Sequence, residues 1–367
     1  MTSFGTFFLP GPTEVRADVL QSMTQPMIAH RGAAFESLFS ELQTGLRELF
    51  RTTRPVYVSS SSATGLMEGA IRNAPPGPIL SLVNGAFAER FADIARSCDR
   101  EVRVLRVTDG DIVSVAAVAQ ALAERWYAAV TVVHSETSTG ALSDIAAVAR
   151  AAHAHGAMIL VDSVTGVGGA PVLTDAWDLD FIFTGSQKAL ALPPGLAFAV
   201  ASERYLLQAD SLSNRGRYFD VVEFEKAARK HQTPNTPAVS LLYATQVQLR
   251  AMLAEGIDAR WARHEAMRVA TERWAMERTA EGLLTGIAAA PGVRSPTVTA
   301  LQLPARLRDS DVVPALARRG FTIGTGYGAL VGSTVRVGHM GDHTVRGLAQ
   351  CLDALTDTLK DALRTVS

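Results

Sequence analysis

Short apolar segments separated by helical patterns are the feature that most constrains how this chain folds. Segments such as 79–83 and 158–161 are rich in branched apolar residues and do not alternate with polar ones. Stretches with the helical spacing of apolar residues lie between them, as at 88–97 and 144–155. Strands that are apolar on both faces are typical of a parallel sheet covered by helices on both sides. The pattern therefore predicts an α/β protein with a mostly parallel sheet. The predicted strands are 56–58, 79–83, 102–107, 129–134, 158–161, 181–184 and 196–201.

The pattern changes at both ends of the chain. Residues 9–12 read Leu-Pro-Gly-Pro and cannot form a regular helix. From about Ala238 a helical stretch rich in alanine, arginine and glutamate runs to residue 281 without a proline, and a smaller mixture of strands and helices follows. We place a domain boundary inside this long helix. The expected parts are an N-terminal arm at 1–15, a large α/β domain at 16–255 and a smaller C-terminal α+β domain at 256–367.

Composition and charge exclude several classes of protein. The 367 residues carry 35 Lys and Arg against 36 Asp and Glu, a formal charge of −1 with no long run of one sign. A nucleic-acid binder would show a basic face, and a membrane-surface protein a polybasic patch. The two cysteines, Cys98 and Cys351, supply neither a disulfide framework nor a metal cluster. Without a signal-peptide pattern or a membrane-length apolar run, we expect a soluble, cytoplasmic protein.

Polar residues follow the predicted strands where ligands bind in open α/β sheets, beyond the carboxyl ends of the strands. Residues 59–65 read Ser-Ser-Ser-Ser-Ala-Thr-Gly directly before a helix. Hydroxyls and free N–H groups at a helix N-terminus suit a phosphate, although an ordinary serine-rich helix cap has the same appearance. This loop has neither the lysine of a Walker loop nor the glycine fingerprint of a dinucleotide site. After the next strand, Phe87 either stacks on a planar cofactor or packs on its own helix.

Three later strands deliver reactive side chains. Residues 135–140 read Ser-Glu-Thr-Ser-Thr-Gly, and Asp162 ends a buried strand. A buried carboxylate is costly unless a cation or donor pairs with it, and a protonated pyridine nitrogen would be such a partner. Lys188 lies in a turn between two apolar strands, where loss of solvent lowers the pKa of an amine and suits Schiff-base chemistry. Alone, Asp162 could cap a turn and Lys188 could be a surface lysine, but the ordered set is what pyridoxal phosphate requires.

Several motifs resemble those of one enzyme family over nearly the whole chain. The chain is similar to the class V, fold-type I aminotransferases of the alanine–glyoxylate and serine–pyruvate group. The block at 185–195, with Gly-Ser-Gln-Lys and Pro-Pro-Gly, is the most specific. The resemblance implies a large domain with a mostly parallel seven-stranded sheet, a smaller C-terminal domain and a homodimer with shared active sites. The other motifs are Pro10-Gly-Pro12, Ser62-Ala-Thr64 before Met67-Glu68, Asn84-Gly85, residues 134–140, Asp162-Ser-Val164 and Arg336-Val-Gly-His-Met-Gly341.

The same resemblance implies a role for each matched residue. Lys188 would form the internal aldimine with pyridoxal phosphate and shuttle the proton, and Asp162 would pair with the pyridine nitrogen. Phe87 stands where the group often places a tryptophan over the ring. Arg336 would clamp the substrate carboxylate. The remaining contacts would be Val164 on the ring, Thr137 on the phenolic oxygen, and Ser62, Ala63, Thr64 and Gln187 on the phosphate, joined by Thr236 of the partner subunit.

The reaction implied is ping-pong transamination of a small amino acid, alanine or serine, with a 2-oxo acid such as glyoxylate or pyruvate. No second arginine is evident for a dicarboxylate, although Arg31, Arg215 and Arg217 lie in loops that could reach the site. An aminotransferase for aminoethylphosphonate, or for pyridoxamine with pyruvate, would reuse the same residues. A cysteine desulfurase is disfavoured by the positions of both cysteines and by Gln187 before the lysine. From another class, a nucleotide-binding oxidoreductase fits the α/β pattern but lacks the glycine fingerprint.

Overall fold

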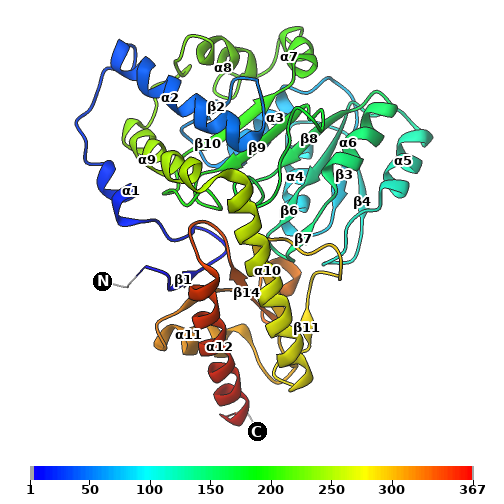
Figure 1. Cartoon of the computed structure of the whole chain (residues 1–367). Coiled ribbons are helices and arrows are strands. Elements are labelled where there is room, and N and C mark those ends of the chain that lie inside the picture. The colour runs from blue at the N-terminus through cyan, green and yellow to red at the C-terminus, as the bar shows by residue number, and fades with distance from the viewer. Residues whose placement is uncertain (1–3, 366–367) are drawn as a thin grey trace.

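The computed structural model describes residues 4–365 and contains a large sheet and a smaller one (Figure 1). The seven-stranded sheet has the order β2-β10-β9-β8-β5-β3-β4. All neighbouring strands from β9 to β4 pair in parallel, whereas β10 is antiparallel to β2 and β9. The predicted fold class, an α/β protein with a mostly parallel seven-stranded sheet, is confirmed. The strands are β2 (Tyr57–Ser59), β3 (Ile79–Val83), β4 (Val102–Arg106), β5 (Ala129–Val133), β8 (Met158–Asp162), β9 (Phe181–Gly185) and β10 (Ala197–Ala201).

Burial explains why these strands contain no polar alternation. Every residue of β3, β5, β8, β9 and β10 is buried, although successive side chains point to opposite faces of the sheet. Helices must therefore cover both faces. The edge strand β4 is half-exposed, and its charged Arg103 and Arg106 suit an edge. The helices between these strands are α3 (Ala63–Arg72), α4 (Ala86–Ser97), α5 (Val115–Glu124) and α6 (Ile145–Ala154).

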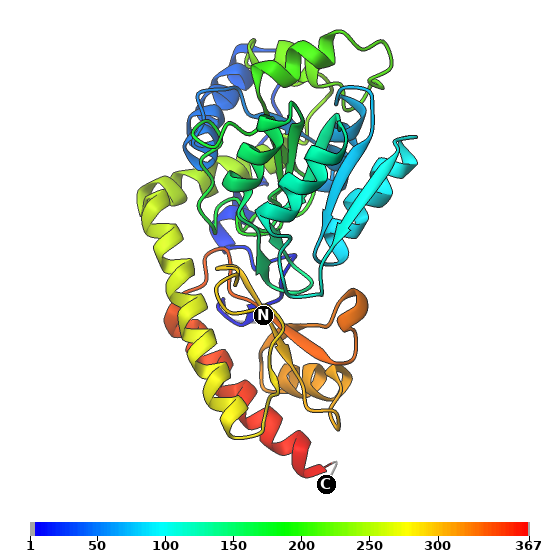
Figure 2. The ribbon, with the colours of Figure 1, turned by 90° about the vertical axis from the view of Figure 1, so that its right-hand side faces the viewer.

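A five-stranded sheet of order β1-β13-β14-β12-β11 forms the centre of the C-terminal part. It has its own hydrophobic cluster, which includes Leu301, Val337 and Leu355. Figure 2 shows α10 (yellow) and α12 (red) along one flank, where they contact each other. The elements are β1 (Phe7–Phe8), β11 (Gly286–Ile287), β12 (Val298–Gln302), β13 (Thr322–Thr325), β14 (Thr334–Gly338), α10 (Ile257–Ala280), α11 (Asp309–Arg318) and α12 (Val345–Thr365).

The prediction of one long helix over residues 239–281 is wrong in one respect. The structure has two helices, α9 (Val239–Glu255) and α10, separated by Gly256 with φ +85°. This left-handed conformation is open to glycine at little cost and ends the first helix. Figure 1 shows the chain changing direction there. The proposed domain boundary near residue 255 coincides with this turn, and the exact division stays a proposal.

The N-terminal arm is more ordered than its proline-rich sequence indicates. Phe7 and Phe8 form β1, which pairs in parallel with Thr322 and Ile323 of β13. A strand of two residues leaves no periodic signal, so the sequence did not predict it. The helices α7 (Glu203–Asp210) and α8 (Val221–Ala228) were also not predicted. The remaining elements are α1 (Ala17–Ser22), α2 (Ala33–Phe50), the hairpin β6 (Ser135–Glu136) and β7 (Ala141–Leu142), and the 3₁₀ turn η1 (Gly328–Leu330).

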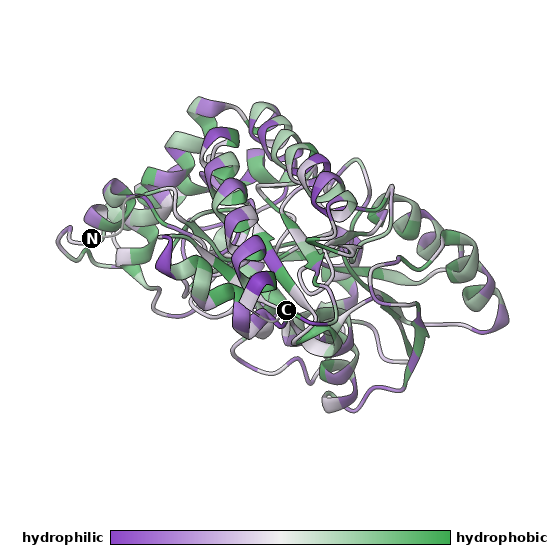
Figure 3. Cartoon of the chain, turned by 90° about the horizontal axis from the view of Figure 1, so that it is seen from below, coloured by the Kyte–Doolittle hydropathy of each residue, from purple (hydrophilic) through white to green (hydrophobic). Residues whose placement is uncertain are grey.

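Hydrophilic residues lie mostly on the outer helices. Figure 3 shows this pattern from below, with purple residues along the helices near the C-terminus and green ones in the strands. Among residues 4–365, no helix is both long enough and apolar enough to cross a membrane.

Candidate active site

A cavity of about 330 Å³ lies at the carboxyl ends of the parallel strands. Val133 and Asp162, the last residues of β5 and β8, form part of its wall. The volume is within the range typical of small-molecule sites. The structure brings all but two of the predicted site residues together around it. The predicted residues that line the cavity are Ser62, Ala63, Thr64, Phe87, Thr137, Asp162, Val164, Gln187 and Lys188.

Lys188 lies in the turn between β9 and β10, and the residue is only 8% exposed. This connection is too short for a crossover, so the two strands are antiparallel and the turn stays at the ligand-binding edge. The Lys188 Nζ donates a hydrogen bond of 2.5 Å to the carbonyl of Pro10. Burial, with a smaller effect from the Arg336 charge, lowers the pKa of Lys188 to about 8. An amine with such a pKa is partly neutral near physiological pH and can act as a nucleophile or a base.

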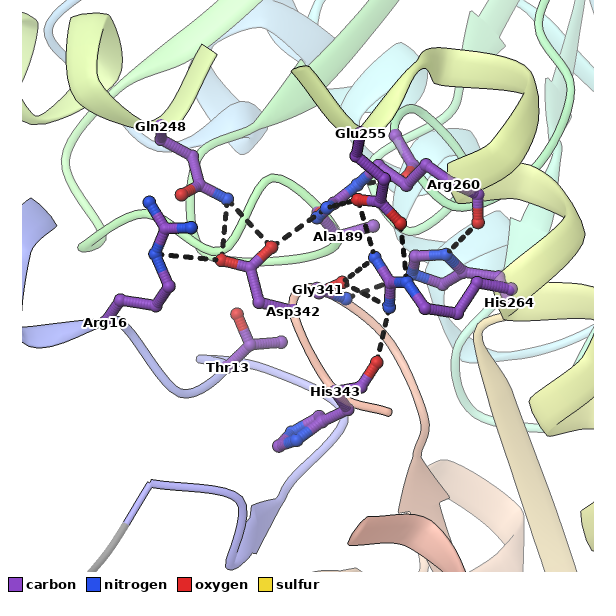
Figure 4. Close-up of polar contacts among 12 residues, drawn as sticks. Thr13, Arg16, Ala189, Gln248, Glu255, Arg260, His264, Gly341, Asp342 and His343 are labelled. Atoms are coloured by element: carbon purple, nitrogen blue, oxygen red, sulfur yellow. Dashed lines mark hydrogen bonds and ion pairs between the residues drawn. The ribbon is translucent and has the colours of Figure 1, made fainter. Parts of the chain in front are cut away.

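An ionic network around the buried Arg260 anchors the turn that carries Lys188 (Figure 4). Arg260, which is 1% exposed, donates to the carbonyl of Ala189 at 2.8 Å. The same guanidinium pairs with Asp342 and Glu255, both at 2.9 Å. A buried arginine is costly unless its charge and N–H groups are satisfied, and here both are. The network therefore joins the backbone beside Lys188 to α10 and to the loop after β14.

Asp162 is a buried carboxylate that needs a partner. Its Oδ1 accepts the Val164 N–H at 2.8 Å. Burial raises the pKa of Asp162 to about 7, against the effect of that hydrogen bond, and the Glu136 charge adds to the rise. A cationic donor in the cavity would restore the carboxylate form. The protonated nitrogen of a pyridine ring is a donor of this kind.

The loop before α3 is suited to an anion. Ser62 is the N-cap residue of α3, yet its side chain makes no capping hydrogen bond. Within residues 4–365, the Ser62 hydroxyl and the N–H groups of Ala63 and Thr64 have no hydrogen-bond partner, whereas the Gly65 N–H donates to the Ser62 carbonyl. The open groups lie at the cavity wall, with Gln187 beside them. The helix dipole favours negative charge at this position. The residues thus fit pyridoxal phosphate, with a phosphate cradle, a partner for the ring nitrogen and an amine for the aldehyde.

Phe87 is held in place by a buried carboxylate. Glu136, which is fully buried, accepts the N–H groups of Phe87 and Ala88 at 3.1 and 3.0 Å. The Phe87 ring stacks on Tyr327 with centroids 5.2 Å apart and planes 12° from parallel. Thr137, the predicted partner of the phenolic oxygen, shares a hydrogen bond of 2.6 Å with Thr165. These contacts position both side chains at the cavity, and their roles toward the cofactor stay predictions.

Two predicted residues do not line the cavity. Arg336, on β14, is 8% exposed, donates to the Thr137 carbonyl at 3.2 Å and lies over the Tyr327 ring. It is thus next to the cavity wall. Thr236 lies in a separate small pocket that includes Ser60. Its predicted role is in the partner subunit, so it stays a prediction.

The sequence reasoning missed Arg90 and named other arginines. Arg90 lines the cavity, and its guanidinium donates to the Tyr327 hydroxyl at 2.7 Å. Its position three residues after Phe87, on the same helix face, was the available signal. By contrast, Arg31 donates to the Thr233 carbonyl at 2.6 Å, and Arg215 pairs with Asp220. Neither they nor Arg217 line the cavity.

We expect the pH dependence of cofactor capture to report the lowered pKa of Lys188. Only the neutral amine condenses with an aldehyde, so capture by the apoprotein should accelerate as pH rises through about 8 and then level off. The measurement is the rate at which the chromophore appears after pyridoxal phosphate is mixed with apoprotein. An acceleration that continues to the ordinary lysine value of 10.5 would contradict it.

Comparisons with known proteins agree with this site. A family model described as Aminotransferase class-V matches residues 11–346. An uncharacterized aminotransferase of Methanocaldococcus jannaschii is 35% identical over 340 residues, covering 91% of this chain and 87% of the relative. The L-aspartate–glyoxylate aminotransferase of Paracoccus denitrificans is 30% identical and covers 94% of this chain and 88% of that protein. The solved alanine–glyoxylate aminotransferase of Nostoc sp. is 30% identical with a TM-score of 0.89, covering 98% of this chain and 95% of that one.

The fold and the cavity together define a pyridoxal phosphate-dependent enzyme of fold type I. More closely, the chain belongs to the class V aminotransferase family, and its activity is that of a transaminase. The cofactor and family that the sequence motifs indicated are confirmed. The oxidoreductase alternative has no support among these relatives.

Proposed function

We propose that this aminotransferase transfers the amino group of a small amino acid, alanine or serine, to a 2-oxo acid such as glyoxylate or pyruvate. The observation that carries the proposal is the presence of a buried lysine and a buried aspartate in one cavity of about 330 Å³. A cavity of this size that also receives the cofactor favours a small donor. The relatives from Paracoccus and Nostoc share glyoxylate in their names, which supports the acceptor.

Each wall of the cavity has a proposed task in transamination. When bound, pyridoxal phosphate supplies an aldehyde and an electron-withdrawing ring. Asp162 would hold the ring nitrogen protonated, and the hydroxyls around Ser62 would hold the phosphate. The Lys188 amine, with its lowered pKa, would take the α-proton of the amino acid and deliver it to C4′, the carbon of the cofactor's aldehyde group. The two half-reactions would then follow in ping-pong order.

Arg90 favours a second candidate within the same reaction class. Its guanidinium reaches the cavity, and a hydroxyl is its hydrogen-bond partner in the part of the chain that the structure describes. A phosphonate is an anion that such a guanidinium would bind. Aminoethylphosphonate is therefore the alternative donor.

A panel of alanine, serine, aminoethylphosphonate and pyridoxamine, each with glyoxylate and pyruvate, tests the proposal. A higher kcat/KM for aminoethylphosphonate or pyridoxamine than for alanine and serine would overturn the proposal of a small amino acid as donor.

The shared active site of a homodimer is also a proposal. The segment that contains Thr236 lies in its own small pocket beside Ser60 and Tyr218. We propose that this segment completes the phosphate site of the partner subunit. A Thr236→Val variant mixed with an inactive Lys188→Ala variant would show the exchange through partial recovery of activity in hybrid dimers.

Replacing Arg336 by alanine should raise the KM for carboxylate donors. A charge-assisted hydrogen bond contributes about 1.5–3 kcal/mol, which corresponds to a rise of about 10- to 150-fold. Steady-state kinetics with the preferred donor provide the measurement. Arg336→Lys keeps the charge but loses the bidentate geometry, so we expect an intermediate KM. An unchanged KM in the alanine variant would remove Arg336 from the substrate site.

A further inference from the structure

Residues 9–13 of the N-terminal arm lie between the Lys188 side chain and the C-terminal sheet. From these contacts we propose that the arm is a positioning element for the Lys188 amine. Whenever the amine is not bonded to the cofactor, the Pro10 carbonyl holds it inside the cavity. The inference rests on the proposed role of Lys188 and adds residues that the sequence motifs did not assign to it.

The arm contacts the lysine turn at three points. The Pro10 carbonyl accepts from Nζ at 2.5 Å, and the Thr13 hydroxyl donates to the Lys188 carbonyl at 2.9 Å. The Thr13 N–H also donates to the Gln187 carbonyl at 2.9 Å. Gly11 lines the cavity between these contacts, and a Cβ on it would lie 2.5 Å from Nζ. The lysine side chain therefore occupies the space that a side chain at residue 11 would need.

The other side of the arm rests on the C-terminal sheet with equally little space. A Cβ on Gly338, the last residue of β14, would lie 2.5 Å from the Leu9 carbonyl oxygen. A Cβ on Gly324 would lie 2.9 Å from the Pro10 ring. Just before this point, Phe8 of β1 pairs with Ile323. Residues 9–13 are thus closely packed between the C-terminal sheet and the Lys188 side chain.

This packing ties the position of the amine to the strand that carries Arg336. Arg336 lies on β14, two residues before Gly338, and its charge acts on Lys188. A carbonyl acceptor also favours the protonated amine that forms when Lys188 takes a proton, in a place where burial disfavours charge. The arm would therefore hold the amine in reach of the reacting atoms during the steps in which it acts as a base.

The test compares two glycines of the same arm. Gly11→Ala places a methyl group 2.5 Å from Nζ, too close for the lysine side chain to keep its position, whereas Gly5→Ala meets nothing within 4 Å. Both residues have positive φ, +113° and +96°, so the second variant controls for backbone strain. We expect Gly11→Ala to slow cofactor capture by the apoprotein and to lower kcat, each by about 10²-fold, with little change in KM. Gly5→Ala should match the wild type in all three.

A second pair of variants tests the arm without adding bulk. Thr13→Val removes the hydrogen bond to the Lys188 carbonyl and should lower kcat and the capture rate about five-fold, and Thr13→Ser should restore both. A rise in KM alone in Gly11→Ala would show that residue 11 is only a wall of the substrate pocket and would overturn the proposal. Capture rates equal to those of Gly5→Ala would also overturn it. Capture is measured without an amino acid, so a wrong choice of donor does not affect this test.

Discussion

Alanine in place of Lys188 should lower kcat by about 10³-fold and remove the covalent chromophore formed with pyridoxal phosphate. The amine is the one nucleophile that the structure places in the cavity wall with a pKa lowered to about 8, among the side chains described there. Without this amine, the protein lacks both the nucleophile that bonds to the aldehyde and the base that transfers the proton. The measurements are steady-state kinetics, the visible spectrum and reduction with borohydride followed by mass analysis.

A surface lysine provides the control for this experiment. Lys360 is exposed on α12, far along the chain from the cavity residues, and Lys360→Ala should retain both activity and chromophore. If the Lys188→Ala protein still forms a borohydride-reducible adduct on a lysine, the assignment of Lys188 is wrong. If the wild-type protein forms the adduct but does not turn over the chosen substrates, the proposed substrates are wrong and the assignment of Lys188 stands.

Asparagine in place of Asp162 should lower kcat by about 10²- to 10³-fold, the loss expected when one preorganised electrostatic partner is removed. The amide has nearly the same shape, but it carries no charge to keep the ring nitrogen protonated. Burial raises the pKa of Asp162 to about 7 and so opposes its charge. The charged carboxylate and the protonated ring nitrogen therefore stabilise each other. Steady-state kinetics and the absorbance spectrum of the bound cofactor give the result.

Asp144 offers a matched control for that substitution. It is exposed, caps α6 through a bond from the Ala147 N–H, and asparagine caps a helix equally well. Asp144→Asn should therefore leave kcat unchanged. A kcat within threefold of the wild type in Asp162→Asn would exclude pairing between this carboxylate and the ring.

Residues at the ends of strands could be predicted, because a strand delivers its next residues to a known edge of the sheet. Asp162 and Lys188 were found in this way and lie in the same cavity. Glu136 was seen as a carboxylate at the site, but not as the acceptor that holds the start of α4. Arg90 was missed although its spacing from Phe87 was a local signal, and its hydrogen bond to Tyr327, which is distant in sequence, could not be predicted.

The fold shows the same division between local and distant causes. Buried strands such as β3 and β9 follow directly from their apolar runs. The break at Gly256 depends on a single left-handed residue within a strong helical pattern, and the helical periodicity on both sides concealed it. Strand β1 exists only because β13 offers an edge for it to pair with.

The amino-acid sequence by itself determined the class of sheet, the cofactor and most of the cavity wall. Apolar periodicity and the order of strand-end residues are local properties, so they can be read along the chain. Only the tertiary structure decided that Pro10 receives the Lys188 amine and that Arg260 anchors the turn beside it. These contacts join segments separated by 178 and 71 residues. Their formation depends on how segments distant in sequence pack together, which no local pattern encodes.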